Sequence, residues 1–153
     1  MKTVHLFLAL TATTFLAAAC SKSPPPEKAE TSHHTHPAPH GGTLVELGDH
    51  VYNLELLRDP AAGNLTAWIL DGHAENFVRI SSRTITLVVL ADGKPTPLML
   101  SAVANSATSE TVGDTSQFEV QAEWLKSAGG FAGTVTLEIK GRKFNLVPFQ
   151  LGK

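Results

Sequence analysis

The chain has 153 residues, of which 42% are hydrophobic, and a formal net charge of -2 at pH 7. This size and composition fit one globular domain with an extension. The near-neutral charge argues against nucleic acid as a partner, because nucleic-acid binding needs a clearly basic face. The single cysteine excludes a disulfide within the chain, so the fold must be stabilised by burial alone.

The N-terminus has the pattern of a secretory signal that ends in a lipidation site. An apolar run over residues 6–19 is too short to be a membrane span. It closes with Leu16-Ala17-Ala18-Ala19-Cys20, which resembles the lipobox of bacterial lipoproteins, except that the large apolar residue stands four places before the cysteine rather than three. We therefore expect a signal peptide over 1–19 and acylation of Cys20; the alternative is ordinary cleavage that leaves a free thiol. By similarity to Gram-negative sorting, Ser21 favours lipid anchoring in the outer membrane, facing the periplasm.

Residues 20–39 are expected to be a disordered tether. They lack apolar periodicity and contain Pro24-Pro25-Pro26, so they bury too little surface to offset the entropy of ordering. At about 3 Å per residue, such a tether would reach on the order of 50–60 Å from the membrane.

A histidine tract joins this tether to the folded part. It contains four of the seven histidines: His33, His34, His36 and His40. Neutral imidazole suits copper, zinc and nickel, so these four residues are candidate metal ligands. A low-complexity linker that binds metal only weakly is the alternative.

Residues 40–153 predict an all-β domain, because short apolar runs alternate with turn signals. The strands expected in its first half are Thr43–Leu47, Val51–Arg58, Leu65–Leu70 and a central buried strand Thr84–Ala91, and Phe77–Ile80 is a candidate for a short edge strand. Those expected in its second half are Pro97–Val103, Ser116–Glu123, Thr134–Lys140 and Lys143–Gln150. A helical turn at 124–126 and a polar loop over 104–115 complete the pattern. Seven to eight antiparallel strands favour an immunoglobulin-like β-sandwich; a small closed barrel is the alternative.

The turn over 60–63 predicts a second pair of histidines. If Asp59 opposes Asn64 across this turn, then Tyr52 faces Asp71 and, beyond them, His50 faces His73. Opposed residues of an antiparallel pair have Cβ atoms about 5 Å apart, so two imidazoles there form a candidate metal site. The alternative is two surface histidines without a role. This arrangement places His40 at the opposite end of the first strand, so we expect two separate histidine clusters.

Other marked residues suggest structural roles. Trp68 and Trp124 are expected in the core or as sheet cover, whereas Glu110, Asp114 and Glu119 are expected to be solvated charges. The sequence has neither a phosphate-binding glycine loop nor a GxSxG elbow, and no serine–histidine spacing that marks a nucleophile, so we expect no enzymatic activity.

The segment from Pro39 to Leu56, which contains the PHGG motif and the YNLEL strand, resembles a group of bacterial envelope lipoproteins with a His-rich leader. The segments Leu70–Phe77 and Glu110–Thr115 share this resemblance. Similar leaders occur near the adaptor proteins of heavy-metal efflux systems, so the resemblance implies a link to metals and to efflux or other envelope proteins as partners. Asn53 departs from the pattern, since relatives often have histidine there.

The sequence thus favours a lipid-anchored envelope protein that binds copper or zinc for sequestration or for hand-over to efflux. Binding should weaken below about pH 6, where protons compete for imidazole. The alternative is a non-catalytic interaction module of an envelope complex, with the histidine tract as its linker.

Overall fold

The structure is a computed structural model that describes residues 36–91, 93–127 and 129–152. The expected signal peptide, Cys20, most of the tether, His33 and His34 lie outside the described residues. The strands belong to a unit that comprises His34–Lys153.

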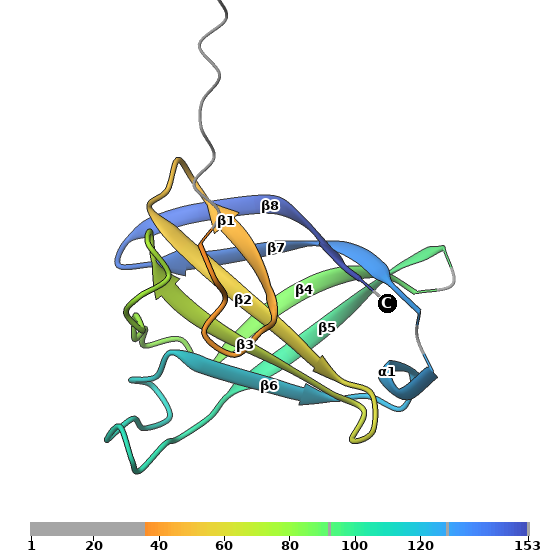
Figure 1. Ribbon diagram of the computed structural model, residues 1–153, viewed down its shortest axis with the longest axis horizontal. Helices are drawn as coiled ribbons and strands as arrows, with labels where there is room; N and C mark the ends of the chain where they lie inside the picture. Colours follow the sequence, from red (N-terminus) through yellow and green to blue (C-terminus); the bar gives the residue numbers. More distant parts are fainter. Residues whose placement is uncertain (1–35, 92, 128, 153) are drawn as a thin grey trace, which may run out of the picture. The chain divides into compact units, whose positions relative to one another are not determined.

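Eight antiparallel strands form one sheet in this unit (Figure 1). The strands are β1 (Thr43–Leu47), β2 (Tyr52–Asp59), β3 (Asn64–Asp71), β4 (Thr84–Ala91), β5 (Lys94–Ala102), β6 (Gln117–Gln121), β7 (Phe131–Ile139) and β8 (Arg142–Leu151). Their order is β1-β2-β3-β6-β5-β4-β7-β8, and the end strands β1 and β8 contact one another, so the sheet is nearly closed. A four-residue helix, α1 (Trp124–Ser127), separates β6 from β7. The prediction of an all-β domain with seven to eight antiparallel strands is confirmed.

Alternation of apolar and polar residues explains which side chains fill the interior. Leu54 and Leu56 of β2 are fully buried, and so are Leu65 and Ile69 of β3. A strand turns successive side chains to opposite faces, so the residues between them, such as Glu55, point to the outside of the sheet. Phe118 of β6 is the largest fully buried side chain.

The predicted register of the first hairpin is confirmed. Asp59 pairs with Asn64, Leu54 with Ile69 and Tyr52 with Asp71. A loop of four residues at 60–63 therefore sets the pairing of two whole strands, because each turn length permits one register. This register brings Glu55 opposite Trp68 on the outer face, where residues 36–42, the described part of the segment before β1 that is called the leader from here on, also lie.

Two expected strands differ from the structure. Phe77–Ile80 forms only isolated bridges, Leu70 to Phe77 and Ile80 to Thr115, because the chain there crosses between two parts of the sheet. Strand β4 has a buried face and an open one, with Val88 37% and Leu90 51% exposed, so it is not buried on both faces as its continuous apolar run predicts. Its outer face has no covering layer among the described residues.

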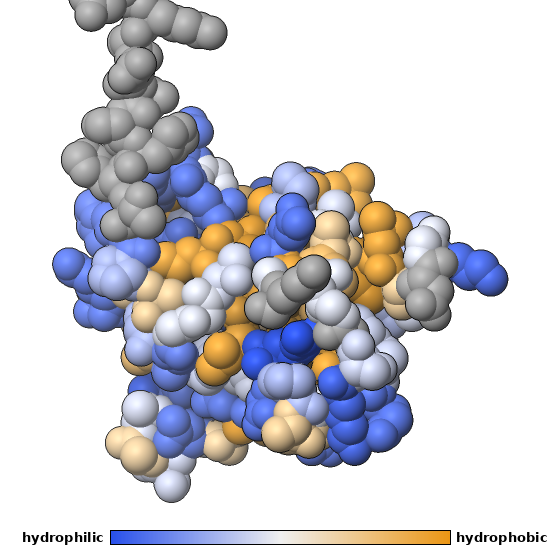
Figure 2. All heavy atoms as spheres, turned by 45° about the vertical axis from the view of Figure 1, so that its right-hand side comes forward, coloured by the Kyte–Doolittle hydropathy of each residue, from blue (hydrophilic) through white to orange (hydrophobic). Residues whose placement is uncertain are grey.

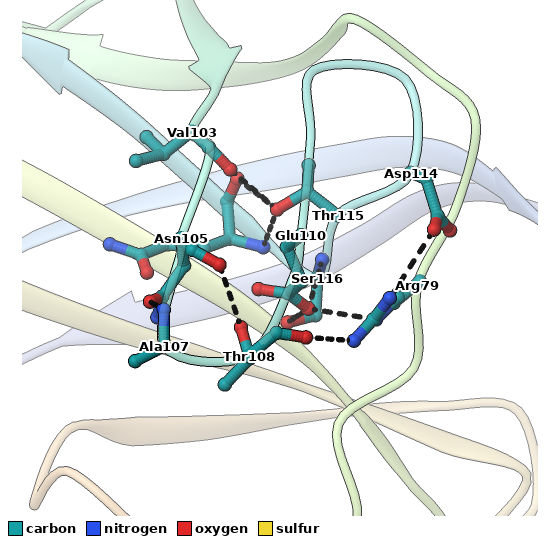
Figure 3. Close-up of polar contacts among 10 residues, drawn as sticks. Arg79, Val103, Asn105, Ala107, Thr108, Glu110, Asp114, Thr115 and Ser116 are labelled. Atoms are coloured by element: carbon teal, nitrogen blue, oxygen red, sulfur yellow. Dashed lines mark hydrogen bonds and ion pairs between the residues drawn. The ribbon is translucent and has the colours of Figure 1, made fainter.

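The polar loop between β5 and β6 contains a buried acid. Glu110 is 6% exposed, and its Oε1 accepts hydrogen bonds from the backbone N–H and the hydroxyl of Ser116. The guanidinium of Arg79 lies against Glu110 and Asp114 and donates to the carbonyl of Thr108 (Figure 3). The expectation that Glu110 is a solvated charge is therefore wrong, since the loop folds over it.

Apolar side chains also reach the surface of this unit (Figure 2). Met99 is 60% exposed and Leu146 is 68% exposed. Within the described ranges, no helix has both the length and the apolar character required to cross a membrane.

Candidate functional site

The leader turns back over the sheet just before β1. The N–H of Gly41 donates to the carbonyl of Ala38 over 3.0 Å, which closes a tight turn at Pro39 and His40. Gly41 has φ +76, a backbone conformation that is strained for residues with a Cβ atom but not for glycine. Gly42 allows a close approach, because a Cβ there would lie 2.6 Å from the carbonyl oxygen of Leu56. These two glycines let the leader reach the outer face of β2.

A buried carboxyl group fixes this turn. Glu55 is 0% exposed, and its Oε1 accepts the N–H groups of His40 at 2.8 Å and of Gly42 at 2.9 Å. Its Oε2 lies 2.8 Å from Nδ1 of His40, a hydrogen bond in which Nδ1 carries the proton when Glu55 is a carboxylate. We call this contact of Glu55 with His40 and Gly42 the leader clamp. It explains how an outward-facing acid comes to be buried.

The imidazole of His40 packs on the sheet at the same point. It stacks on the indole of Trp68, with 3.8 Å between ring centroids and 12° between planes. The Phe77 ring lies 5.7 Å from it. The clamp holds Nδ1 and the stacking holds the ring plane, so Nε2 keeps a fixed direction. A carboxyl group on one imidazole nitrogen is the usual support of a metal-binding histidine, and it is equally a structural anchor.

Two other histidines meet beside the clamp. The rings of His36 and His73 lie edge to face with 5.5 Å between centroids. His36 precedes the turn at residues 38–41, whereas His73 lies in the turn after β3. The expectation of two separate histidine clusters is therefore wrong, because the leader reverses direction at Gly41 and brings His36 to the end of β3.

The paired site of His50 and His73 stays a prediction. Both residues lie beyond the ends of the paired strands β2 and β3. His50 is 3.6 Å from Glu46 through Nδ1, and its backbone N–H also donates to that carboxyl group. The nearest ring to His73 in the described part of the chain is that of His36.

Asn53 has a structural role in this region. It is 5% exposed, and its Nδ2 donates to the carbonyls of Asp71 and Gly72 at 3.0 Å each. This amide joins β2 to the start of the turn that contains His73.

Hydrogen bonds centred on Asp71 shape that turn. Its side chain accepts the N–H of Glu75 at 2.9 Å and the side-chain amide of Asn76 at 2.6 Å. Burial raises the pKa of Asp71, but these bonds, with those from the backbone of Asn76 and His73, outweigh it. The pKa of Asp71 therefore lies below its ordinary value, and the charged form stabilises the turn.

Sequence reasoning missed the roles of Glu55 and Phe77, and it missed the turn of the leader that buries Glu55. Glu55 stands between two inward leucines, as the outward polar residues of an alternating strand do, so the sequence around it gave no signal of its burial. What the pattern did not reveal is that the leader covers this face. Within residues 36–91, 93–127 and 129–152, no group of three or more His, Cys, Asp or Glu residues is arranged to hold a metal ion. A metal site on the His36–His73 pair would thus need further ligands.

Comparisons with models of protein families, with curated proteins and with solved structures give no match for this chain.

Proposed function

We propose that this chain is a lipid-anchored envelope protein that binds a transition-metal ion, copper or zinc, through histidines of its leader. The observation that carries the proposal is the contact of His36 with His73 at 5.5 Å between ring centroids. With metal–nitrogen bonds of about 2.0 Å, two imidazoles on one tetrahedral ion have centroids roughly 5 Å apart. The observed pair is close to that spacing.

The remaining ligands would come from the leader. His33 and His34 precede His36 by only a few residues, and they lie outside the described residues. His40 would position the leader rather than complete the pair, because the clamp fixes its imidazole on Trp68. A site with partly exposed ligands from a terminal segment exchanges its ion readily, which suits sequestration and hand-over to an efflux partner.

Titration of the full chain with zinc and with copper tests this proposal. We expect His36→Ala and His73→Ala each to weaken binding by about tenfold or more, because each removes one first-sphere ligand. His50→Ala is the matched control: it removes an exposed histidine that lies against Glu46. If His50→Ala weakens binding while His36→Ala does not, the ion lies between His50 and His73 instead. If wild type binds neither metal below about 10 μM, where binding free energy is about −7 kcal/mol, the metal proposal fails.

A second candidate is the non-catalytic interaction module. The outer face of β4 and β5 favours it, since Val88, Leu90 and Met99 are exposed there. Single exposed apolar residues are common, but three on adjacent strands form a patch of the kind that protein partners cover. Retention of an envelope partner by wild type but not by Met99→Lys would support this candidate.

A further inference from the structure

A pocket beside the leader clamp is independent of the proposed metal ligands. It has a volume of about 400 Å³, within the range of about 300–1,000 Å³ that small-molecule sites occupy. The leader, the segment from Asn76 to Arg79, strand β3 and the loop between β5 and β6 all contribute to its walls. The polar side of this loop is drawn in Figure 3.

One wall of the pocket is aromatic. It consists of Trp68, the imidazole of His40 stacked on it, and Phe77, which is 46% exposed. The planes of His40 and Phe77 are inclined by 43°, so these rings do not form a parallel slot for a flat aromatic ligand. They offer apolar contact to one face of a ligand.

The polar wall consists of side-chain amides whose orientation is fixed. Asn76 donates to Asp71, Gln117 donates to Glu119, and Asn105 accepts from the backbone of Ala107. Within the described part of the chain, no hydrogen bond occupies the other amide atom of each: Oδ1 of Asn76, Oε1 of Gln117 and Nδ2 of Asn105. Two acceptors and one donor are therefore preset, and hydroxyl groups can match both kinds.

The charges of the pocket are compensated within the protein. Arg79 lies 3.5 Å from Glu110 and 3.3 Å from Asp114, and Glu110 is held by Ser116 (Figure 3). The polar partner of His40 is the buried Glu55, which lies behind it. An anionic or cationic ligand would have to compete with these pairs, whereas an uncharged ligand leaves them intact.

We propose that this pocket binds an uncharged saccharide, whose apolar ring face packs on Phe77 and His40 while its hydroxyl or acetamido groups bond to Asn76, Asn105 and Gln117. A pyranose ring matches this pattern, because it has one apolar face and a polar edge that both donates and accepts. The site needs no metal and does not include His36 or His73. A failure of the metal proposal would therefore leave the saccharide proposal unaffected, and the reverse is also true.

The test uses the full chain with Trp124→Phe, so that Trp68 is the only tryptophan. Its fluorescence is followed during titration with the trimer of N-acetylglucosamine and, separately, with maltotriose. The buffer contains a metal chelator and a detergent whose headgroup is not a sugar. We expect saturable binding of at least one of the two, with a Kd of about 1 mM or below. Phe77→Ala should weaken it by about fivefold to tenfold, because an aromatic contact is lost.

Asn105→Asp is the sharper variant. It keeps the acceptor for Ala107 and the shape of the side chain but replaces the free donor, so we expect about tenfold weaker binding with an unchanged unfolding midpoint. Met99→Ala, exposed on β5, is the control and should bind like wild type. The proposal is overturned if neither saccharide gives a saturable signal up to about 20 mM, if Phe77→Ala and Asn105→Asp bind like wild type, or if adenosine or inorganic phosphate binds and the saccharides do not.

Discussion

Glu55 decides, as a single residue, whether the leader stays on the sheet. Its carboxyl group is fully buried and is the shared acceptor for two backbone N–H groups and one imidazole. Removing one acceptor therefore leaves several donors without partners at once. The free energy of unfolding then falls by more than the net contribution of one hydrogen bond, because the donors left without an acceptor remain partly buried.

We expect Glu55→Ala to lower the free energy of unfolding by about 3 kcal/mol. The measurement is urea unfolding followed by circular dichroism. Glu46→Ala is the control on the neighbouring strand, since its side chain is 42% exposed, and it should cost less than about 1 kcal/mol. Equal effects of the two substitutions would contradict the role of the clamp.

Gly72 is a second residue with a defined steric role. A Cβ at this position would lie 1.9 Å from the carbonyl oxygen of His50, a contact with rigid backbone. We expect Gly72→Ala to destabilise the fold by about 3 kcal/mol, because the end of β3 must move away from His50. Thermal unfolding measures this effect.

Gly129→Ala serves as the comparison for Gly72→Ala. A Cβ at Gly129 would meet no atom within 4 Å, and the residue has no left-handed φ. We expect the free energy of unfolding to change by less than about 0.5 kcal/mol, or to rise slightly because alanine restricts the unfolded chain more than glycine does. A similar melting temperature for the two variants would refute the steric argument at Gly72.

At the scale of elements, the turn from Asp71 to Phe77 links the sheet to both candidate sites. It contains His73 and ends at Phe77, and the charged form of Asp71 stabilises it. Because the pKa of Asp71 is lower in the folded than in the unfolded chain, its contribution is fully present above about pH 4. The contribution is lost as pH falls through the lower, folded pKa.

Stability measured between neutral pH and pH 3 should reveal this turn. In a chelator, we expect wild type to lose more stability than Asp71→Asn over the range below about pH 4, because the asparagine cannot titrate. Urea unfolding at each pH supplies the comparison. Parallel pH profiles of the two proteins would contradict the assignment.

The sequence predicts elements well where a strong local pattern determines them. The hairpin of β2 and β3 has its predicted register, because the turn at 60–63 permits one pairing. The open face of β4 was missed, since a continuous apolar run does not tell which face another layer covers. The meeting of His36 with His73 was also missed: it depends on a chain reversal at Gly41 and on the burial of Glu55, both of which are tertiary facts.

At the scale of the whole molecule, the sheet has two ends that do not pair by hydrogen bonds. Strands β1 and β8 contact one another, but the hydrogen-bonded order begins at one and ends at the other. We call the boundary between β1 and β8 the seam. The hydrophobic interior is continuous across it, because Leu47 of β1 and Leu151 of β8 belong to the same core. Side-chain packing rather than backbone pairing closes the sheet.

Hydrogen exchange should map this difference. We expect the amides of β1 and β8 that face the seam to exchange faster than those of β3 and β6, which have neighbours on both sides. Exchange measured by NMR at neutral pH gives the comparison. Equal protection along all eight strands would mean that the seam is hydrogen-bonded in solution.

The leader clamp also sets the local concentration of the His36 imidazole around His73. His36 is four residues from the point where His40 and Glu55 hold the leader, so its imidazole samples only a small volume around His73. A ligand attached by a short segment behaves as if present at about millimolar concentration or above, without any new contact. An ion that bridges the two histidines would therefore lose affinity when the clamp is broken, although Glu55 does not touch it. If the proposed chelate forms, the carboxyl group that anchors the leader would thereby control the affinity of a site that it does not contact.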